Sequence, residues 1–212
     1  IFGELISLIE IDKRKDMANE LSATLPYSKE IFVVPRNLNI FGTMNSADRS
    51  VGTIDIALRR RFKFVPMTPY AKAISNELTL NHINPHNVDG IDVIKLFETT
   101  NSRIELLLDR NHLLGHAMFM SISNGGDVIR IVRDKIVPLM EEYFFNDLQK
   151  IQLIFNDLDE SGELRNDAIY MHSILSADSY FAYIGDYLIL DKKRYFINPK
   201  IAVSSITHIY GE

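Results

Sequence analysis

The sequence predicts an α/β fold that continues into an α-helical bundle and a small C-terminal α+β extension. Two short apolar runs rich in β-type residues, 37–44 and 62–67, enclose a short helical segment, which is typical of an α/β core. Helical periodicity then dominates three longer stretches that Gly, Pro and an Asn-Gly-Gly turn separate: 71–81, 91–108 and 127–145.

The two ends of the chain add one predicted element each. Residues 2–9 of the opening "IFGELISLIEIDKRK" have helical spacing and predict an amphipathic helix. Because this helix lacks an N-cap, we expect its first residues to continue a larger domain. Residues 13–36 are polar and predict a loop or hairpin. Near the C-terminus, "YLILDKKRYFIN" at 187–198 predicts a hairpin around 191–193.

Composition limits the class of protein. The 212 residues are 46% hydrophobic, enough to bury a substantial core, and the net charge of −5 argues against a nucleic-acid footprint over the whole surface. No cysteine is present, which excludes disulfides and thiolate metal sites and fits an intracellular protein. No run reaches the roughly 18 to 20 apolar residues of a membrane span. We therefore expect a soluble, cytoplasmic protein without a membrane partner.

The most informative stretch is "FGTMNSADRSVGTIDIALRRRF", residues 41–62. An apolar strand ends at Asn45, and a turn rich in Asn, Ser and Asp leads into a helix from about residue 53 to Arg61. Cations are favoured at a helix C-terminus, and this alone accounts for one arginine. Three consecutive arginines cannot share one face of a short helix, so we expect at least one to point away from the domain, where a guanidinium can clamp phosphoryl oxygens.

These residues carry a family resemblance. The segment "VPRNLNIFGTMNSADRSVGTIDIALRRRF" resembles the stretch from sensor 1 to the arginine finger of AAA+ NTPases. Among them it is similar to the McrB family, the GTP-using motors of methylation-dependent restriction, whose signature has the form MNxADRS. The opening helix resembles the one that follows the Walker B strand, and "DRNHLLGHAMFM" and "IVPLMEEYFF" resemble the helical lid. The resemblance covers residues 1–157.

The resemblance implies three parts. Residues 1–70 correspond to the C-terminal part of an AAA+ (P-loop NTPase) core, residues 71–157 to the lid, and residues 158–212 to an extension that packs against the lid. A P-loop needs a Gly-Lys pair, which the sequence lacks. "IQLIFNDLDE" at 151–160 is interrupted by polar residues and follows the lid, the wrong place for Walker B. The resemblance therefore implies an incomplete core fragment that is inactive alone, with the ligands for GTP or ATP and Mg²⁺ outside this chain.

The resemblance also implies residue roles. Asn45 is placed as sensor 1, where its amide orients the attacking water, although a helix cap is the alternative. Asp48 and Arg49 order the nucleotide site or meet a partner subunit, unless they form a surface ion pair. Arg60 and Arg61 are the candidates for a finger that acts on the neighbouring subunit.

Two further assignments follow from the same comparison of motifs. Arg59 is assigned a local structural contact. His116 matches the lid position at which sensor 2 contacts the nucleotide, with a structural lid histidine as the alternative. As partners, the resemblance implies a homo-oligomer in a hexameric ring, an McrC-like nuclease subunit, and DNA bound through a separate domain. The alternative function is a non-catalytic interaction module that docks on AAA+ subunits.

Three weaker patterns favour structural interpretations. His112 and His116 have the spacing of helical zinc ligands, but Gly115 breaks the helix and no third ligand is evident. "DLDESGELRNDA" at 157–168 imitates an EF-hand loop, yet its twelfth residue is alanine and not the required glutamate, so a solvated turn is expected. The aromatic residues at 143–145 are interpreted as lid core and not as a base-stacking platform.

Overall fold

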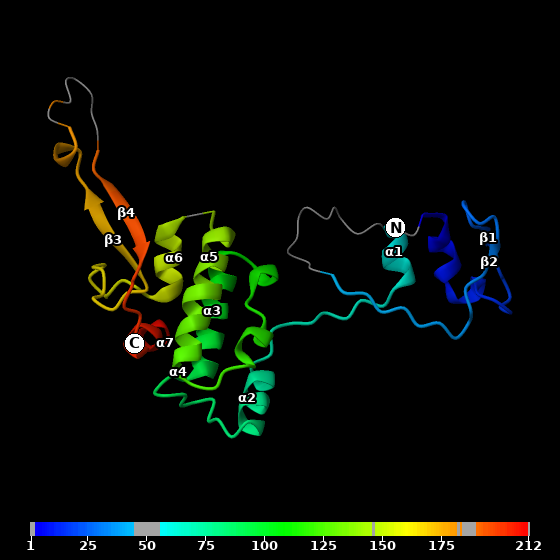
Figure 1. Cartoon of the computed structure of the whole chain (residues 1–212), viewed down its shortest axis with the longest axis horizontal. Coiled ribbons are helices and arrows are strands. Elements are labelled where there is room, and N and C mark those ends of the chain that lie inside the picture. Colours follow the sequence, from blue (N-terminus) through cyan, green and yellow to red (C-terminus); the bar gives the residue numbers. More distant parts are fainter. Residues whose placement is uncertain (1–2, 45–55, 146, 182, 184–189, 212) are drawn as a thin grey trace. The chain divides into compact units, whose positions relative to one another are not determined.

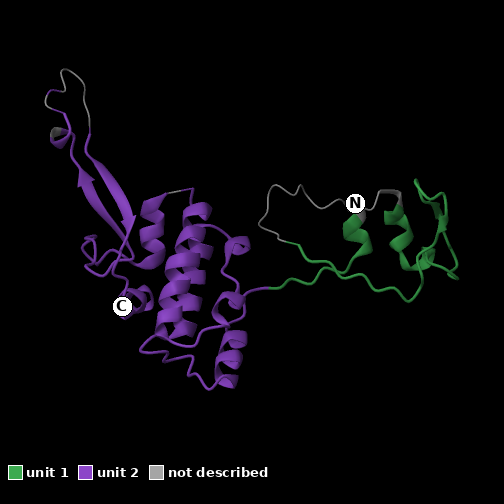
Figure 2. Ribbon diagram, viewed as in Figure 1, with its two compact units in different colours: residues 1–67 green, residues 68–212 purple. Residues whose placement is uncertain are grey.

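The computed structural model describes residues 3–44, 56–145, 147–181, 183 and 190–211 (Figure 1). The chain divides into two compact units, residues 1–67 and residues 68–212 (Figure 2). Residues 158–212 belong to the same unit as the predicted lid, so no boundary between compact units falls at residue 157. Among the residues that the structure describes, every helix is too short or too polar to traverse a lipid bilayer.

The first unit consists of short elements. In chain order they are the 3₁₀ helices η1 (Gly3–Ile9) and η2 (Ile11–Lys13), the strands β1 (Ala23–Thr24) and β2 (Ile31–Phe32), and the helix α1 (Ile56–Arg61). β1 and β2 pair antiparallel, which confirms the hairpin predicted within 13–36. The opening segment is helical as predicted, with 3₁₀ geometry, and it buries Leu8 and Ile9.

The two strands predicted for the α/β core are not formed. Residues 37–44 and 62–67 contain no strand in the structure, and the side chains of Phe41 and Met67 are 94% and 87% exposed. The prediction of a buried strand ending at Met44 is therefore wrong for this structure. A strand needs a neighbour for its N–H and C=O groups, and the described residues supply none for these two segments. The apolar sequence indicates a preference for burial that this unit does not satisfy.

The second unit is mainly helical, and all three predicted lid helices are present. Its α-helices and the one π-helical turn have the following bounds: α2 Ala71–Leu80, α3 Val93–Leu107, α4 Gly125–Ile131, η5 (the π-helical turn) Val132–Ile136, α5 Val137–Tyr143, α6 Leu148–Phe155 and α7 Val203–Tyr210. Three short 3₁₀ helices connect them: η3 Arg110–His112, η4 His116–Phe119 and η6 Ala177–Ser179.

Short polar side chains fix where the lid helices begin. Asp92, Asn124 and Asp147 each occupy the N-cap, and each side chain accepts a hydrogen bond from the backbone N–H three residues later. Such caps satisfy donors that a helix leaves unpaired at its start and stabilise it by about 1 kcal/mol each. At the other end of α6, Asn156 adopts a left-handed conformation (φ 58°) that stops the helix.

A wide turn interrupts the longest helical stretch, which runs from α4 through η5 to α5. Residues 132–136 form a π-helical turn, and Pro138 follows at the start of α5. Proline lacks an N–H and its ring clashes with the carbonyl four residues earlier. The wider turn relieves this clash without ending the helix.

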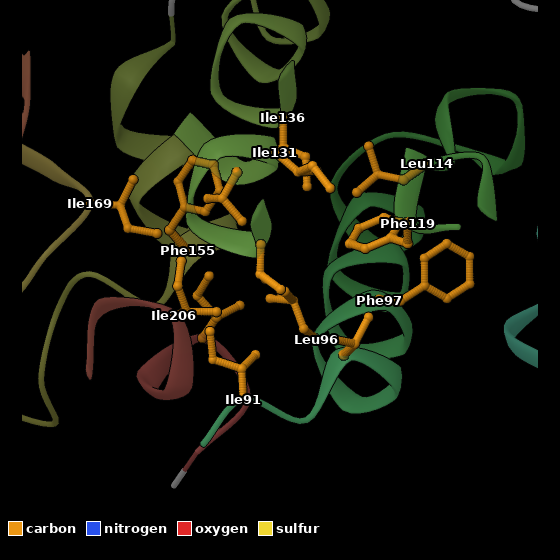
Figure 3. Packing of buried hydrophobic residues seen from close by; sticks show 14 of the residues in the cluster. Ile91, Leu96, Phe97, Leu114, Phe119, Ile131, Ile136, Phe155, Ile169 and Ile206 are labelled. Carbon is orange, nitrogen blue, oxygen red and sulfur yellow. The ribbon is translucent and has the colours of Figure 1, made fainter. Parts of the chain in front are cut away.

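The core of the second unit joins helices that lie far apart in the sequence. Figure 3 shows Phe97 of α3 beside Phe119 of η4, and their rings meet edge to face with centroids 5.4 Å apart. Phe155 of α6, Ile169 and Ile206 of α7 belong to the same buried cluster (Figure 3). The C-terminal extension therefore packs against the lid, as the sequence predicts.

An antiparallel ribbon extends from these helices (Figure 1). It consists of β3 (Tyr170–Leu175) and β4 (Lys192–Ile197), paired in register from Tyr170 with Ile197 to Leu175 with Lys192. The hairpin predicted around 191–193 is wrong, because Lys192 and Lys193 lie inside β4. A strand of an exposed ribbon needs few apolar residues. The charged residues at the start of β4 therefore have the composition that is typical of a turn.

Candidate functional site

The three consecutive arginines occupy the last turn of α1, in the first unit. Cations are favoured at this end of a helix, where unpaired carbonyls carry partial negative charge. Arg59 is exposed and places its guanidinium 5.9 Å from the ring centroid of Phe64. This cation–π contact is worth about 0.5 to 1 kcal/mol at an exposed site. It is the kind of local contact that the sequence predicts for Arg59.

Arg61 points back into the unit. Its side chain is only 8% exposed, and its Nη2 lies 2.6 Å from Oε1 of Glu10, just after η1. Lys13 approaches the other oxygen of Glu10 at 3.0 Å. The hydrogen bond from Lys13 and the charges of Arg61 and Lys13 hold the pKa of the Glu10 carboxyl below its usual range. Arg61, one of two predicted finger residues, is therefore engaged in an ion pair within its own unit.

Arg60 differs from both neighbours. It is exposed, and among the described residues no carboxylate forms an ion pair with it and no ring stacks on it. Since successive residues of a helix are rotated by about 100°, Arg60 leaves the helix between the directions of Arg59 and Arg61. Of the three guanidiniums, that of Arg60 is the one presented to solvent without a described partner.

Sequence patterns gave no sign of the role of Arg14. Its Nε and Nη2 donate to the carbonyl of Ile9 at 3.1 and 3.0 Å, and its Nη1 donates to the carbonyl of Leu38 at 2.6 Å. One guanidinium thus joins the end of η1 to the segment that leads towards Asn45. No spacing rule identifies such an arginine, because its partners are backbone carbonyls, one of them 24 residues away.

Three predicted site residues, Asn45, Asp48 and Arg49, lie outside the described residues. Their assignments remain predictions. The structure places the segment before them, which ends at Met44, and the helix after them, which is described from Ile56. It therefore defines the two ends of the predicted sensor 1 loop.

The predicted lid residue His116 lies in the second unit, whereas the three arginines lie in the first. It is half-buried at the first position of η4, and its Nδ1 is buried without a hydrogen bond among the described residues. His112 has a structural environment: its Nδ1 lies 2.9 Å from Oδ1 of Asp109, and its ring meets that of Tyr143 edge to face. Within the described ranges, no three His, Asp or Glu residues cluster as metal ligands do.

Asp157, expected in a solvated turn, is instead completely buried. Its two carboxylate oxygens accept hydrogen bonds from the backbone N–H groups of Ile169 and Tyr170, both at 2.7 Å. The sequence suggested exposure because Asp, Ser and Gly surround it. The residues that follow fit that expectation, since residues 159–163 are exposed and Asp159 closes a tight turn with Ser161.

A histidine of the last helix completes this buried cluster. His208 of α7 is 8% exposed, with Nε2 at 3.3 Å from Oδ1 of Asp157 and Nδ1 at 3.4 Å from Oδ1 of Asp167. Burial raises the pKa of Asp167, but a hydrogen bond with Ser204 and the proximity of His208 together lower it by more. The net effect is a pKa below the usual value of a carboxyl group. This cluster anchors α7 to the loop between α6 and β3, which is a structural role.

Comparison with known proteins agrees with the helical architecture. Residues 92–152 match the sequence model of the McrB α-helical lid domain. Over 171 residues the chain is 36% identical to the Type IV methyl-directed restriction enzyme EcoKMcrB subunit of Escherichia coli strain K12. The alignment covers 74% of this chain and 36% of that protein, so the chain spans about a third of the relative's length. The chain belongs to the McrB-like family, of which it represents a C-terminal part that includes the helical lid.

Proposed function

We propose that this chain is part of an AAA+ motor subunit that hydrolyses GTP or ATP in a McrB-like restriction system acting on modified DNA. Family membership supports the restriction context, since the related E. coli protein is a subunit of a methyl-directed restriction enzyme. The observation that carries the catalytic part is the exposed Arg60, between an arginine on Phe64 and one paired with Glu10.

In this proposal the chain stabilises the charge of the transition state and orients the attacking water. It does not bind the nucleotide's phosphates and Mg²⁺ itself. The sequence has no Gly-Lys pair and no metal-ligand cluster appears among the described residues, so these residues do not fit a triphosphate–Mg²⁺ cradle. We assign the binding of GTP or ATP with Mg²⁺ to residues outside this chain. Asn45 would orient the attacking water, with Asp48 and Arg49 ordering the loop around it.

Arg60 is our choice for the finger, ahead of Arg61. A finger must extend beyond its own subunit and reach the phosphates of a neighbour, where it contributes on the order of a thousand-fold to turnover. The side chain of Arg61 is 8% exposed and held by Glu10, so reaching a neighbour would require breaking that ion pair. Arg60 has no such pair to break.

A mixing experiment on the intact parent protein tests this assignment. Arg60→Ala should abolish most turnover while nucleotide still binds. Arg59→Ala, which removes the same charge from an exposed site, should retain most of it. Adding a subunit with an inactivated Walker motif and an intact Arg60 should restore activity, with a maximum at intermediate ratios. Activity that stays at the level of the two inactive parents would exclude a finger acting in trans.

A finger that acts on a neighbouring subunit also determines what we propose about assembly. A finger in trans requires a homo-oligomer, and a hexameric ring is the arrangement we propose. An McrC-like nuclease subunit would be the effector, and a separate domain would bind DNA. In the lid, His116 would contact the nucleotide, since its buried Nδ1 has no hydrogen bond among the described residues.

A second candidate is a non-catalytic module that docks on complete AAA+ subunits through its finger edge, where Arg60 is exposed. The two candidates differ in one measurement. A docking module, added as a separate chain, should change the turnover of complete subunits through Arg60. A motor fragment should act only when joined covalently to its nucleotide-binding part. Full-length subunits titrated with this chain, wild type against Arg60→Ala, separate the two.

A further inference from the structure

The β3–β4 ribbon has two chemically different faces. Residues paired across antiparallel strands lie on the same side of the sheet, and sides alternate along each strand. One face combines the pairs Tyr170–Ile197, His172–Tyr195 and Ile174–Lys193, and its inner end packs on the helices. The other face combines the pairs Met171–Phe196, Ser173–Arg194 and Leu175–Lys192.

The second face presents two cations and an aromatic ring in line. Lys192, Arg194 and Phe196, hereafter the cationic stripe, alternate along β4 and therefore point to the same side. Lys192 and Arg194 are exposed and Phe196 is 42% exposed. Neither strand contains an acidic residue, and within the described ranges no carboxylate pairs with either cation. In a chain of net charge −5 the stripe is a local reversal of sign.

We infer that the cationic stripe binds the sugar–phosphate backbone of DNA. Alternate residues of a strand are about 6.7 Å apart. That spacing is close to the roughly 6.8 Å, measured along the helix axis, between a phosphate of one DNA strand and the phosphate two positions further on. Lys192 and Arg194 can each take one phosphate, and Phe196 can pack against the adjoining sugar or base.

The ribbon's shape favours DNA over an acidic protein. A two-stranded β-ribbon fits the major groove of duplex DNA, where one face of the ribbon meets the backbone or the base edges. An extended acidic peptide would also satisfy the two cations. Polyglutamate supplies such charge without a sugar or base for Phe196, so a test must compare it with DNA.

The test is a titration of the ¹⁵N-labelled chain, 24.3 kDa, with a 12-base-pair duplex, followed by amide chemical shifts. We expect shifts in β3 and β4. Two phosphate contacts predict affinity that falls on the order of ten-fold between 50 and 200 mM salt. The double variant Lys192→Ala/Arg194→Ala should lose this binding. Phe196→Ala should weaken it, most strongly for a single-stranded oligonucleotide.

A charge-matched control isolates the stripe. Lys193 lies on the opposite face, and Lys95 is an exposed residue of α3. Lys95→Ala/Lys193→Ala removes the same two charges and should keep affinity within about two-fold, because neither lysine lies on the stripe's face and a charge that takes no phosphate adds only screened attraction.

Four results would overturn the inference. Equal losses of DNA affinity in both double variants, or identical shifts with polyglutamate at equal charge, would show attraction by charge alone. Dilution-dependent shifts in β4 without DNA would indicate a second copy of the chain as the partner, and an absence of shifts in the ribbon at low salt would show that DNA does not bind there. None of these readings depends on nucleotide turnover. Failure of the finger assignment would leave the ribbon titration unchanged, and failure of the ribbon titration would leave the finger assignment unchanged.

Discussion

The buried carboxylate of Asp157 provides the sharpest test of how the second unit is held together. Each oxygen accepts one backbone N–H at 2.7 Å, from Ile169 and from Tyr170, and Oδ1 also lies 3.3 Å from Nε2 of His208. Asp157→Asn keeps the shape of the side chain but replaces one acceptor by an NH₂ group. One backbone N–H then loses its acceptor and faces another donor.

The expected cost follows from this change. Leaving one buried N–H without a partner costs about 1 to 3 kcal/mol. The remaining hydrogen bond loses its charge assistance, which we take as about 1 kcal/mol more. We therefore expect Asp157→Asn to lower the free energy of unfolding of the second unit by about 3 kcal/mol. At this size of protein, that corresponds to a decrease in Tm of about 6 to 12 °C.

Urea unfolding followed by far-UV circular dichroism suits a chain without tryptophan. The control is Asp159→Asn, at an exposed carboxylate two residues away in the same loop, where water can replace lost hydrogen bonds and the cost should be far smaller. The slope of the free energy against urea should stay constant, because the same surface unfolds. A value for Asp157→Asn within 1 kcal/mol of wild type, or equal to that for Asp159→Asn, would refute the assigned role.

Three further predictions concern other sites. In the intact parent protein, Asn45→Ala should lower turnover about a hundred-fold with little change in nucleotide affinity, and a parallel loss of affinity in steady-state and binding assays would show a different role. Gly125→Ala places a Cβ 3.0 Å from that of Asp89 and should cost about 1 to 3 kcal/mol in urea unfolding, whereas Gly115→Ala, with open space around it, should cost far less. Burial raises the pKa of Tyr170, so the stability that its neutral form contributes is present below about pH 10 and is lost as the pH rises further. Tyr170→Phe should reduce this loss of stability at alkaline pH. An unchanged slope of the free energy of unfolding against pH would contradict the prediction.

The lid was the predictable part of the fold because its signals are local. Helical periodicity and breakers such as the Asn-Gly-Gly turn at 124–126 place the three predicted helices within a few residues of α2, α3 and the stretch from α4 to α5. The helix α6 was not predicted. The packing of the C-terminal residues on the lid was also predictable, since their apolar residues need a neighbour to cover them.

Elements that depend on distant partners were not predictable in the same way. The run 37–44 has the composition of a buried strand, but a strand forms only against a neighbour. The ion pair between Glu10 and Arg61 joins residues about fifty apart in the sequence. The burial of Asp157 depends on contacts, such as the hydrogen bond from Tyr170, that are specific to this fold. Three adjacent arginines look equivalent in the sequence, and only the structure separates their environments.

The π-helical turn before Pro138 makes the longest helical stretch of the lid mechanically uneven. On either side of 132–136, regular helix resists bending because each residue adds a backbone hydrogen bond. At the turn, the proline removes one of those bonds, so the segments 125–131 and 137–143 meet at a joint. Force applied to one end of this stretch would concentrate there and tilt one segment against the other before either melts. The lid thus contains a built-in point of compliance, set by a single residue.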